Sequence, residues 1–188
     1  NPAESAKGYG PELIESVEFG LKGMYMDNRL SINAAIFDNE HEDMQIAYFT
    51  AEAAAASVVL NNSAEQSGFE LEAVALLSDT LQFTFNYGSL DSNYTESVVA
   101  SDGWAPELFP YAPKSMIFAS LEKDYGNYRM RLDYSRIGEH NAFPYNTLDP
   151  RSKLTHIEER GIADFRLLMS PMDNMDLTFW IKNLNNES

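Results

Sequence analysis

The sequence predicts an all-β protein, an antiparallel up-and-down meander of about eight long strands. Three observations predict it. Apolar and polar side chains alternate over long runs, which is the period of a strand and not of a helix. Short turn sequences centre near residues 27, 79, 126 and 173, at spacings of 52, 47 and 47 residues. Longer connections, rich in Gly, Pro, Asn and clustered charge, lie near residues 50–56, 92–113 and 139–157.

The first hairpin is predicted from two runs on either side of Asp27-Asn28, which is a tight-turn dipeptide. One face of the first run carries Val17, Phe19, Leu21 and Tyr25, and the other carries Glu18, Gly20 and Lys22. The second run places Leu30, Ile32, Ala34 and Ile36 on one face, against Ser31 and Asn33. Residues 29–49 could form one strand of about twenty residues, whereas ordinary globular strands have ~5–6.

Three further hairpins follow the same plan. The second has Phe69, Leu71, Ala73 and Ala75, a turn at Ser78-Asp79-Thr80, and then Leu81, Phe83, Phe85 and Tyr87. The third has Ile117, Ala119 and Leu121, a turn at Tyr125-Gly126-Asn127, and then Tyr128, Met130, Leu132 and Tyr134. The fourth has Ala163, Phe165, Leu167 and Met169, a turn at Met172-Asp173-Asn174, and then Leu177, Phe179 and Ile181. Trp180 falls on the polar side of the last strand, which indicates packing inside a barrel or a register shift at a bulge.

Short turns at one end and long loops at the other are typical of an outer-membrane barrel. The apolar runs are far shorter than the ~20 residues of a membrane helix, but a spanning strand needs ~9–11 residues that are apolar alternately. A sheet in lipid must close on itself to satisfy its backbone. The other face would then line an aqueous lumen, and it carries Glu18, Lys22, Glu70, Gln82, Asn86, Arg129, Arg131 and Arg166. A soluble β-sandwich would have an equally apolar buried face and stays open as an alternative.

Composition excludes several functions. The 188 residues carry a net charge of −16, which argues against a nucleic-acid partner because phosphate requires a basic face. The absence of cysteine excludes disulfides, thiolate metal sites and cysteine nucleophiles. Glu70 and Glu72 share a strand face as a glycosidase pair might, but charged lumen walls are ordinary. We therefore expect no enzyme activity, no cofactor and no metal centre, and interpret His41, His140 and His156 as ordinary loop or strand-end histidines.

Four stretches resemble the barrel of TonB-dependent receptors. They are Pro11-Glu12 with the run from Glu18 to Gly23, the run from Arg29 to Phe37, the run from Ser67 to Glu72, and the run from Leu177 to Leu184. The resemblance implies a 22-stranded barrel with an N-terminal plug, in the outer membrane of a Gram-negative bacterium. It implies uptake of a scarce nutrient, most commonly an iron–siderophore complex, energised through the TonB complex. Residues 1–188 would be a partial barrel domain, with the plug, the TonB-binding region and the closing strands outside it.

Two other functions remain open at this stage, a passive porin-like channel and a soluble β-sheet binding protein. The candidate ligand contacts lie in the Pro-rich long loops, where aromatic and basic side chains could grip a cargo from outside. They are Trp104, Tyr111, Tyr145 and Arg151. The expected partners are outer-membrane lipid, the TonB complex, and a small-molecule or metal-chelate cargo.

Overall fold

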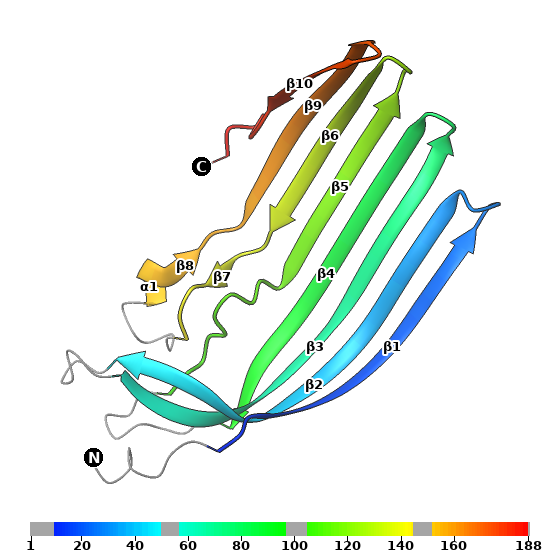
Figure 1. Ribbon diagram of the computed structural model, residues 1–188. Helices are drawn as coiled ribbons and strands as arrows, with labels where there is room; N and C mark the ends of the chain where they lie inside the picture. The colour runs from blue at the N-terminus through cyan, green and yellow to red at the C-terminus, as the bar shows by residue number, and fades with distance from the viewer. Residues whose placement is uncertain (1–9, 50–56, 97–104, 145–151, 188) are drawn as a thin grey trace.

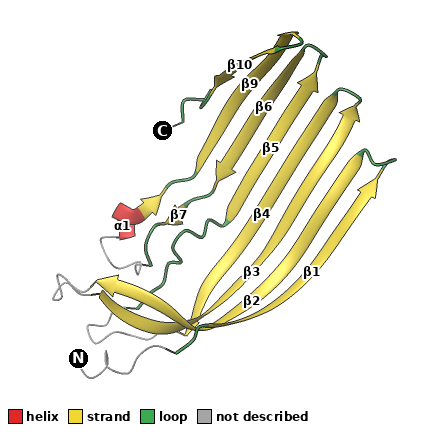
Figure 2. Ribbon diagram, viewed as in Figure 1, coloured by secondary structure: helices red, strands yellow, loops and turns green. Residues whose placement is uncertain are grey.

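The computed structural model describes residues 10–49, 57–96, 105–144 and 152–187. Its main feature is a sheet of eight long strands (Figures 1 and 2). These strands are β1 (Leu13–Tyr25), β2 (Leu30–Phe49), β3 (Ser57–Ser78), β4 (Leu81–Glu96), β5 (Ser115–Asp124), β6 (Tyr128–Ile137), β9 (Arg160–Met172) and β10 (Met175–Ile181). A small sheet of β7 (His140–Asn141) and β8 (His156–Ile157) lies in a loop beside the four-residue helix α1 (Ser152–Thr155).

The large sheet is an antiparallel meander in the order β1-β2-β3-β4-β5-β6-β9-β10. The four tight turns all lie at one end of the sheet, and the long connections lie at the other (Figure 1). Within the described residues the sheet is open, with β1 and β10 as its edges. The predicted meander is therefore confirmed. In the described part of the chain, no helix has the length and apolar character needed to span a membrane.

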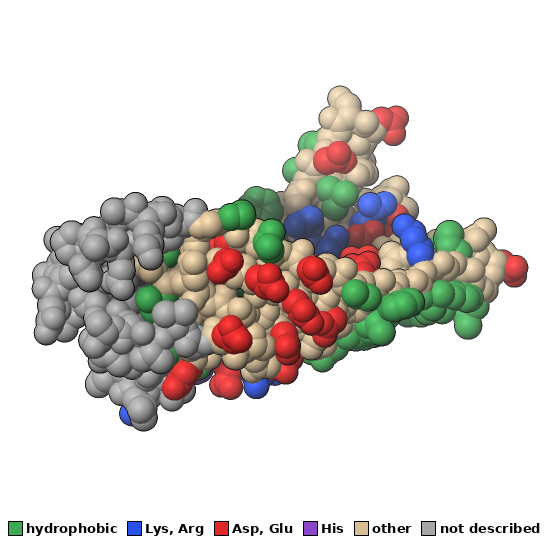
Figure 3. All heavy atoms as spheres, turned by 90° about the horizontal axis from the view of Figure 1, so that it is seen from below, with side chains coloured by type: hydrophobic (Ala, Val, Ile, Leu, Met, Phe, Trp, Pro, Cys, Tyr) green, Lys and Arg blue, Asp and Glu red, His purple; other side chains and the backbone are tan. Residues whose placement is uncertain are grey.

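The strand register places apolar side chains side by side across the whole sheet. One row crosses all eight strands and contains only apolar or aromatic side chains: Tyr25, Leu30, Ala75, Phe83, Leu121, Leu132, Phe165 and Ile181. Neighbouring rows on the opposite face are polar and charged, for example Gln82, Glu122, Arg131 and Arg166. In Figure 3, hydrophobic side chains form a band on one side of the sheet near the short turns, and Lys and Arg side chains lie in its hollow.

The apolar face is uncovered. Phe19 is 72% exposed, and the buried apolar residues among those described are few, namely Ile46, Ala64 and Pro106. A β-sandwich would cover this face with a second sheet about 10 Å away. The described residues form a single layer at this face, so the apolar side chains have no protein partner there.

The β2–β3 hairpin extends past its neighbours at the long-loop end. Met44 to Phe49 pair with Ser57 to Asn62 beyond the reach of β1 and β4, and the extension turns away from the line of the sheet (Figure 1). The bend coincides with a register shift between His41 and Met44 and with a positive φ of 56° at Asp43. A bulge of this kind bends a strand. Ile46, 7% exposed, packs there against Met44, Leu60 and Tyr94.

Candidate functional site

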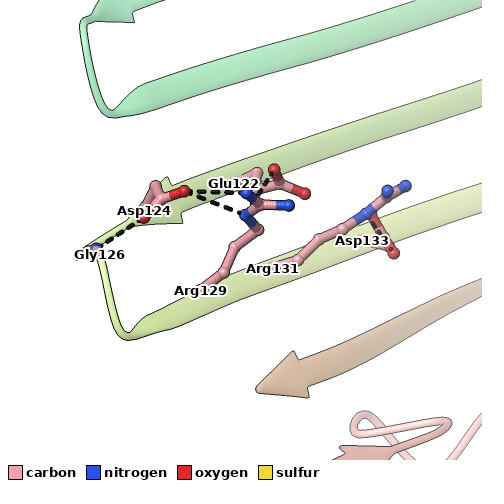
Figure 4. Close-up of polar contacts among 6 residues, drawn as sticks. All are labelled: Glu122, Asp124, Gly126, Arg129, Arg131 and Asp133. Atoms are coloured by element: carbon pink, nitrogen blue, oxygen red, sulfur yellow. Dashed lines mark hydrogen bonds and ion pairs between the residues drawn. The ribbon is translucent and has the colours of Figure 1, made fainter. Parts of the chain in front are cut away.

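The polar face near the short turns carries a cluster of charge on β5 and β6 (Figure 4). The guanidinium of Arg129 contacts Asp124 at 2.9 Å and Glu122 at 3.5 Å. The other oxygen of Asp124 accepts a hydrogen bond of 2.7 Å from the backbone N–H of Gly126, whose φ of +85° favours glycine in this turn. The hairpin turn and the charge of the polar face are thus tied together through one carboxylate.

A second part of this cluster spans β6, β9 and β10. Arg131 and Arg166 are register partners, and like charges directly opposite one another are destabilising. Arg131 turns instead toward Asp133, whose oxygens lie 2.7 and 3.0 Å from its Nε. Arg166 is exposed and has no ion-pair partner among the described residues, and its next register partner is Trp180, 63% exposed. The face therefore presents a free guanidinium beside an indole.

Trp180 lies on the polar side of β10, as the sequence predicts. A bulge, the other predicted possibility, is also present in β10, because the register shifts between Met175 and Leu177. After that shift, Leu177 is the register partner of Met169 on the apolar face, so Trp180 remains opposite Arg166. The bulge precedes the tryptophan and does not move it to the apolar face.

A shallow open groove of about 350 Å³ lies further along the polar face, across β3, β4, β5 and β6. Carboxylates Glu70 and Glu72 line one part of it, and Met116 and Phe118 line another. Glu72 accepts a hydrogen bond of 3.2 Å from Asn33 on the next strand. The groove combines acidic and apolar surface, which suits contact with another protein segment or a ligand and not a closed catalytic pocket. Among the described residues, no group of three or more His, Asp and Glu is arranged to hold a metal ion.

The opposite, apolar face ends at a row of carboxylates toward the long-loop end. Glu15, Glu40 and Glu65 are successive register partners on β1, β2 and β3, and all three are exposed. Burying a carboxylate in an apolar environment is costly, so the apolar part of this face stops short of this row. Sequence reasoning missed the row because its members are 25 residues apart along the chain. The row can be found from the sequence only if the strand register of the first hairpin is continued from β2 to β3.

The long loops are fastened at the same end. Tyr94 near the end of β4 stacks on Phe109 with ring centroids 4.3 Å apart, and burial raises the pKa of Tyr94, which keeps its hydroxyl protonated. Pro110 forms a parallel bridge with Asn141 of β7. The backbone N–H of Tyr111 donates to the carbonyl of Asn141 at 2.7 Å. Two loops far apart in sequence are therefore held together beside the predicted ligand mouth.

Tyr111 is the one predicted ligand contact that falls within the described part of the chain. Its φ of 54° is unusual for a tyrosine, and its side chain is 70% exposed. The other three, Trp104, Tyr145 and Arg151, lie outside the described residues. All four positions remain predictions.

An ion pair closes the base of the β6–β9 loop. The guanidinium of Arg136 contacts Glu159, and it also donates to the hydroxyl of Ser115 at 3.2 Å. The hydrogen bond from Arg136 holds the pKa of the Glu159 carboxyl below its ordinary range. His156 lies 3.9 Å from Glu139 in the same loop. Polar contacts thus organise this loop where the apolar face ends.

The order of strands, the end at which the turns lie and the two faces of the sheet agree with a known family. The family model described as TonB dependent receptor-like, beta-barrel matches residues 2–184. The chain belongs to the TonB-dependent receptor β-barrel family. Members of this family are receptors and transporters and not enzymes. The resemblance inferred from four sequence stretches is confirmed.

Solved structures of TonB-dependent receptors have the same fold. The ferric-catecholate import receptor Fiu of E. coli K12 is 18% identical, with a TM-score of 0.72 over 94% of this chain and 24% of that receptor. The ferric yersiniabactin uptake receptor FyuA of Yersinia pestis is 19% identical, with a TM-score of 0.70 over 93% of this chain and 25% of that one. The copper transporter OprC is 16% identical, with a TM-score of 0.72 over 96% and 26%. No curated protein matches the sequence.

These TonB-dependent structures are 22-stranded barrels, and this chain spans about a quarter of the length of each receptor it matches. The open eight-stranded sheet corresponds to part of such a barrel. The predicted fold class, an antiparallel meander that is part of a 22-stranded barrel, is therefore confirmed, and the domain limits of residues 1–188 stay a prediction.

Proposed function

We propose that this chain forms part of the wall of an outer-membrane importer that takes up an iron–siderophore complex with energy from TonB. The observation that carries the proposal is the uncovered two-faced sheet, whose apolar row crosses eight strands while the opposite face is charged. The apolar face would contact lipid and the charged face would line the lumen. Similarity to receptors for ferric catecholate and ferric yersiniabactin supports an iron chelate as the cargo.

The cargo would first contact the long loops. Tyr111 supports this placement because its side chain is exposed while its backbone is fixed by the hydrogen bond to Asn141. An exposed aromatic ring on a fixed backbone loses little conformational freedom when it binds a ligand. Trp104, Tyr145 and Arg151 would complete the contact surface, with Arg151 meeting an anionic chelate.

The remaining partners would act through parts of the protein outside these residues. In the proposed receptor a plug occupies the lumen, and the TonB complex engages an N-terminal region. The free guanidinium of Arg166 beside Trp180, and the acidic groove at Glu70, support a lumen face that contacts further protein. No nucleic acid or catalytic reaction is part of the proposal.

Uptake by the full-length protein tests the proposal. In cells that lack other siderophore receptors, we expect uptake of radioactive iron from a catecholate chelate, and loss of that uptake when TonB is deleted. Uptake that persists without TonB would favour a passive channel. A detergent-free, monodisperse full-length protein would favour a soluble binder. Copper uptake is measured in the same cells, because the copper transporter is equally similar in structure.

The Tyr111→Ala variant tests the ligand mouth. We expect a rise in the chelate concentration for half-maximal uptake of roughly fivefold, the usual consequence of removing one aromatic contact. Tyr25→Ala is the matched control, because Tyr25 is 43% exposed in the apolar row at the short-turn end. Equal uptake by wild type and Tyr111→Ala would contradict this part of the proposal.

A further inference from the structure

Two lysines lie within the described strands, and they belong to opposite faces of the sheet. Lys22 on β1 is the register partner of Asn33, in the polar row that continues to Glu72. Lys123 on β5 is the register partner of Leu81 and Met130, which belong to the apolar face. Lys123 thus places an ammonium at the edge of the surface that the proposed function turns toward lipid.

The surroundings of Lys123 leave its charge without a counter-ion. Its Nζ donates to the hydroxyl of Thr80 at 2.6 Å and lies 5.6 Å from the ring centroid of Tyr125. The nearby carboxylates of Glu122 and Asp124 belong to the other face, where both contact Arg129. Lys123 has no ion-pair partner among the described residues, so about two of the three donors of its ammonium remain available.

Two tyrosines lie at the same level. Tyr125 stacks on Tyr128 with ring centroids 5.0 Å apart and an interplanar angle of 23°. Their side chains are 51% and 45% exposed. Tyrosine favours the boundary between hydrocarbon and water because its ring is apolar and its hydroxyl forms hydrogen bonds. The stacked pair therefore places Lys123 at headgroup depth.

An anion at this depth would complete the site. An unpaired ammonium beside hydrocarbon is costly, and a long lysine side chain reaches toward the interface to find a partner. The phosphate of a lipid headgroup supplies both the opposite charge and acceptors for the free donors. The other end of the apolar face differs, because Glu15, Glu40 and Glu65 form its edge on β1 to β3 and would repel phosphate.

We propose that Lys123, Tyr125 and Tyr128 form a binding site for the phosphate of a glycerophospholipid headgroup in the leaflet on the short-turn side. Lys123 binds the phosphate oxygens, and the two rings pack against the glycerol and the first carbons of the acyl chains. The inference rests on the proposed function in one respect, that the apolar face contacts lipid.

The test uses the full-length receptor in detergent, titrated with phosphatidylglycerol and followed by native mass spectrometry. We expect Lys123→Gln to weaken binding of the first lipid by about tenfold, which corresponds to one charge-assisted hydrogen bond. Lys123→Arg should retain most of the affinity because it keeps the charge. Lys22→Gln is the matched control and should leave the affinity unchanged. Dioleoylglycerol, which lacks phosphate, should bind wild type and Lys123→Gln equally.

Unchanged phospholipid affinity in Lys123→Gln would overturn the site, and so would either of two other outcomes. One is equal loss of affinity in Lys123→Gln and Lys22→Gln, and the other is binding of dioleoylglycerol as tight as that of phosphatidylglycerol. Spin labels at Phe83 and Gln82 in the Lys123→Gln receptor distinguish rejection of the headgroup site from rejection of the proposed function. Lipid exposure at Phe83 and water exposure at Gln82, with unchanged phospholipid affinity, would reject the headgroup site alone. Equal exposure at both labels would reject the membrane placement as well.

Discussion

Aromatic rings from a neighbouring strand cover Gly68 and Gly161. Phe37 is the register partner of Gly68 and its ring lies over that residue, and the ring of Tyr134 lies over Gly161. Glycine weakens a strand because it has no side chain to pack and loses more backbone entropy on folding. A ring from the neighbouring strand replaces part of that packing, as cross-strand aromatic pairs do in other sheets.

Substitution of Gly68 should therefore destabilise the sheet. A Cβ at this position would overlap the Phe37 ring and the backbone carbonyl oxygen of Ser89, and the backbone cannot move aside without breaking strand pairing. We expect Gly68→Ala to lower the free energy of unfolding by about 1–3 kcal/mol. Urea unfolding of the full-length receptor in detergent, followed by heat-modifiable gel migration, measures the change.

Gly88→Ala is the matched control for Gly68→Ala. Gly88 lies on the same polar face in the adjacent strand, and its added Cβ would meet one atom, the Cε of Met116, at 4.0 Å. We expect little change in the unfolding midpoint. If both variants unfold at the same urea concentration, the explanation from the Phe37 ring is wrong.

Among the strands, the β2–β3 hairpin has two parts, one within the large sheet and one that extends beyond it. Below the bulge near Asp43 both strands belong to the barrel wall, and above it they pair with each other alone. The backbone N–H of Gln45, just past the bulge, donates to a carboxylate oxygen of Glu12 at 2.8 Å. This bond ties the extension to the start of the β1 segment. The extension thus gains stability from local packing at Ile46 and from this contact at its base.

Ile46→Ala should loosen the extension without affecting the wall. The substitution leaves a cavity among Met44, Leu60 and Tyr94, and burial losses of this type cost about 2–5 kcal/mol. We expect faster proteolysis between β2 and β3 in the full-length receptor, with unchanged heat-modifiable migration. Leu154→Ala is the control, because Leu154 is 84% exposed on α1. Wild-type resistance to protease in Ile46→Ala would show that Ile46 does not hold the extension.

The whole sheet has one apolar and one charged face, and the proposed function assigns a different solvent to each. A soluble domain of this size would bury most of its apolar surface in a core, whereas here the apolar row remains exposed. The polar face carries ion pairs such as that of Arg129 with Asp124. Closure of the sheet must come from further strands, because both edges of the described sheet lack a pairing strand within the described residues.

Alternate residues of β4 should therefore report different solvents in the intact receptor. Spin labels at Phe83 and Gln82, adjacent in sequence and on opposite faces, are placed in the full-length protein in lipid. We expect relaxation by oxygen at Phe83 and by a water-soluble nickel chelate at Gln82. The pair Leu132 and Arg131 should repeat this difference on β6. Equal accessibility within both pairs would contradict the lipid-facing assignment of the apolar row.

Local sequence patterns are enough to predict the strands and to assign their two faces. The two-residue period, the turn dipeptides and the long run from Arg29 to Phe49 are local features, and the structure places a twenty-residue β2 there. The sequence also predicted Trp180 on the polar side, because one strand's alternation is enough to assign its faces. Local patterns predict the ends of the strands less well than their faces. The predicted loop at 92–113 begins inside β4, which continues to Glu96 because β3 still offers backbone partners there.

The tertiary structure decided which side chains meet. Glu15 stands beside Glu40 and Glu65, and Arg166 stands beside Trp180, because residues far apart in the chain share a register. A shift of one residue would send each side chain to the other face. The hydrogen bond between Tyr111 and Asn141 and the hydrogen bond from Lys123 to Thr80 likewise join residues far apart in the chain. Alternation is a property of one strand, whereas a site requires the register between strands.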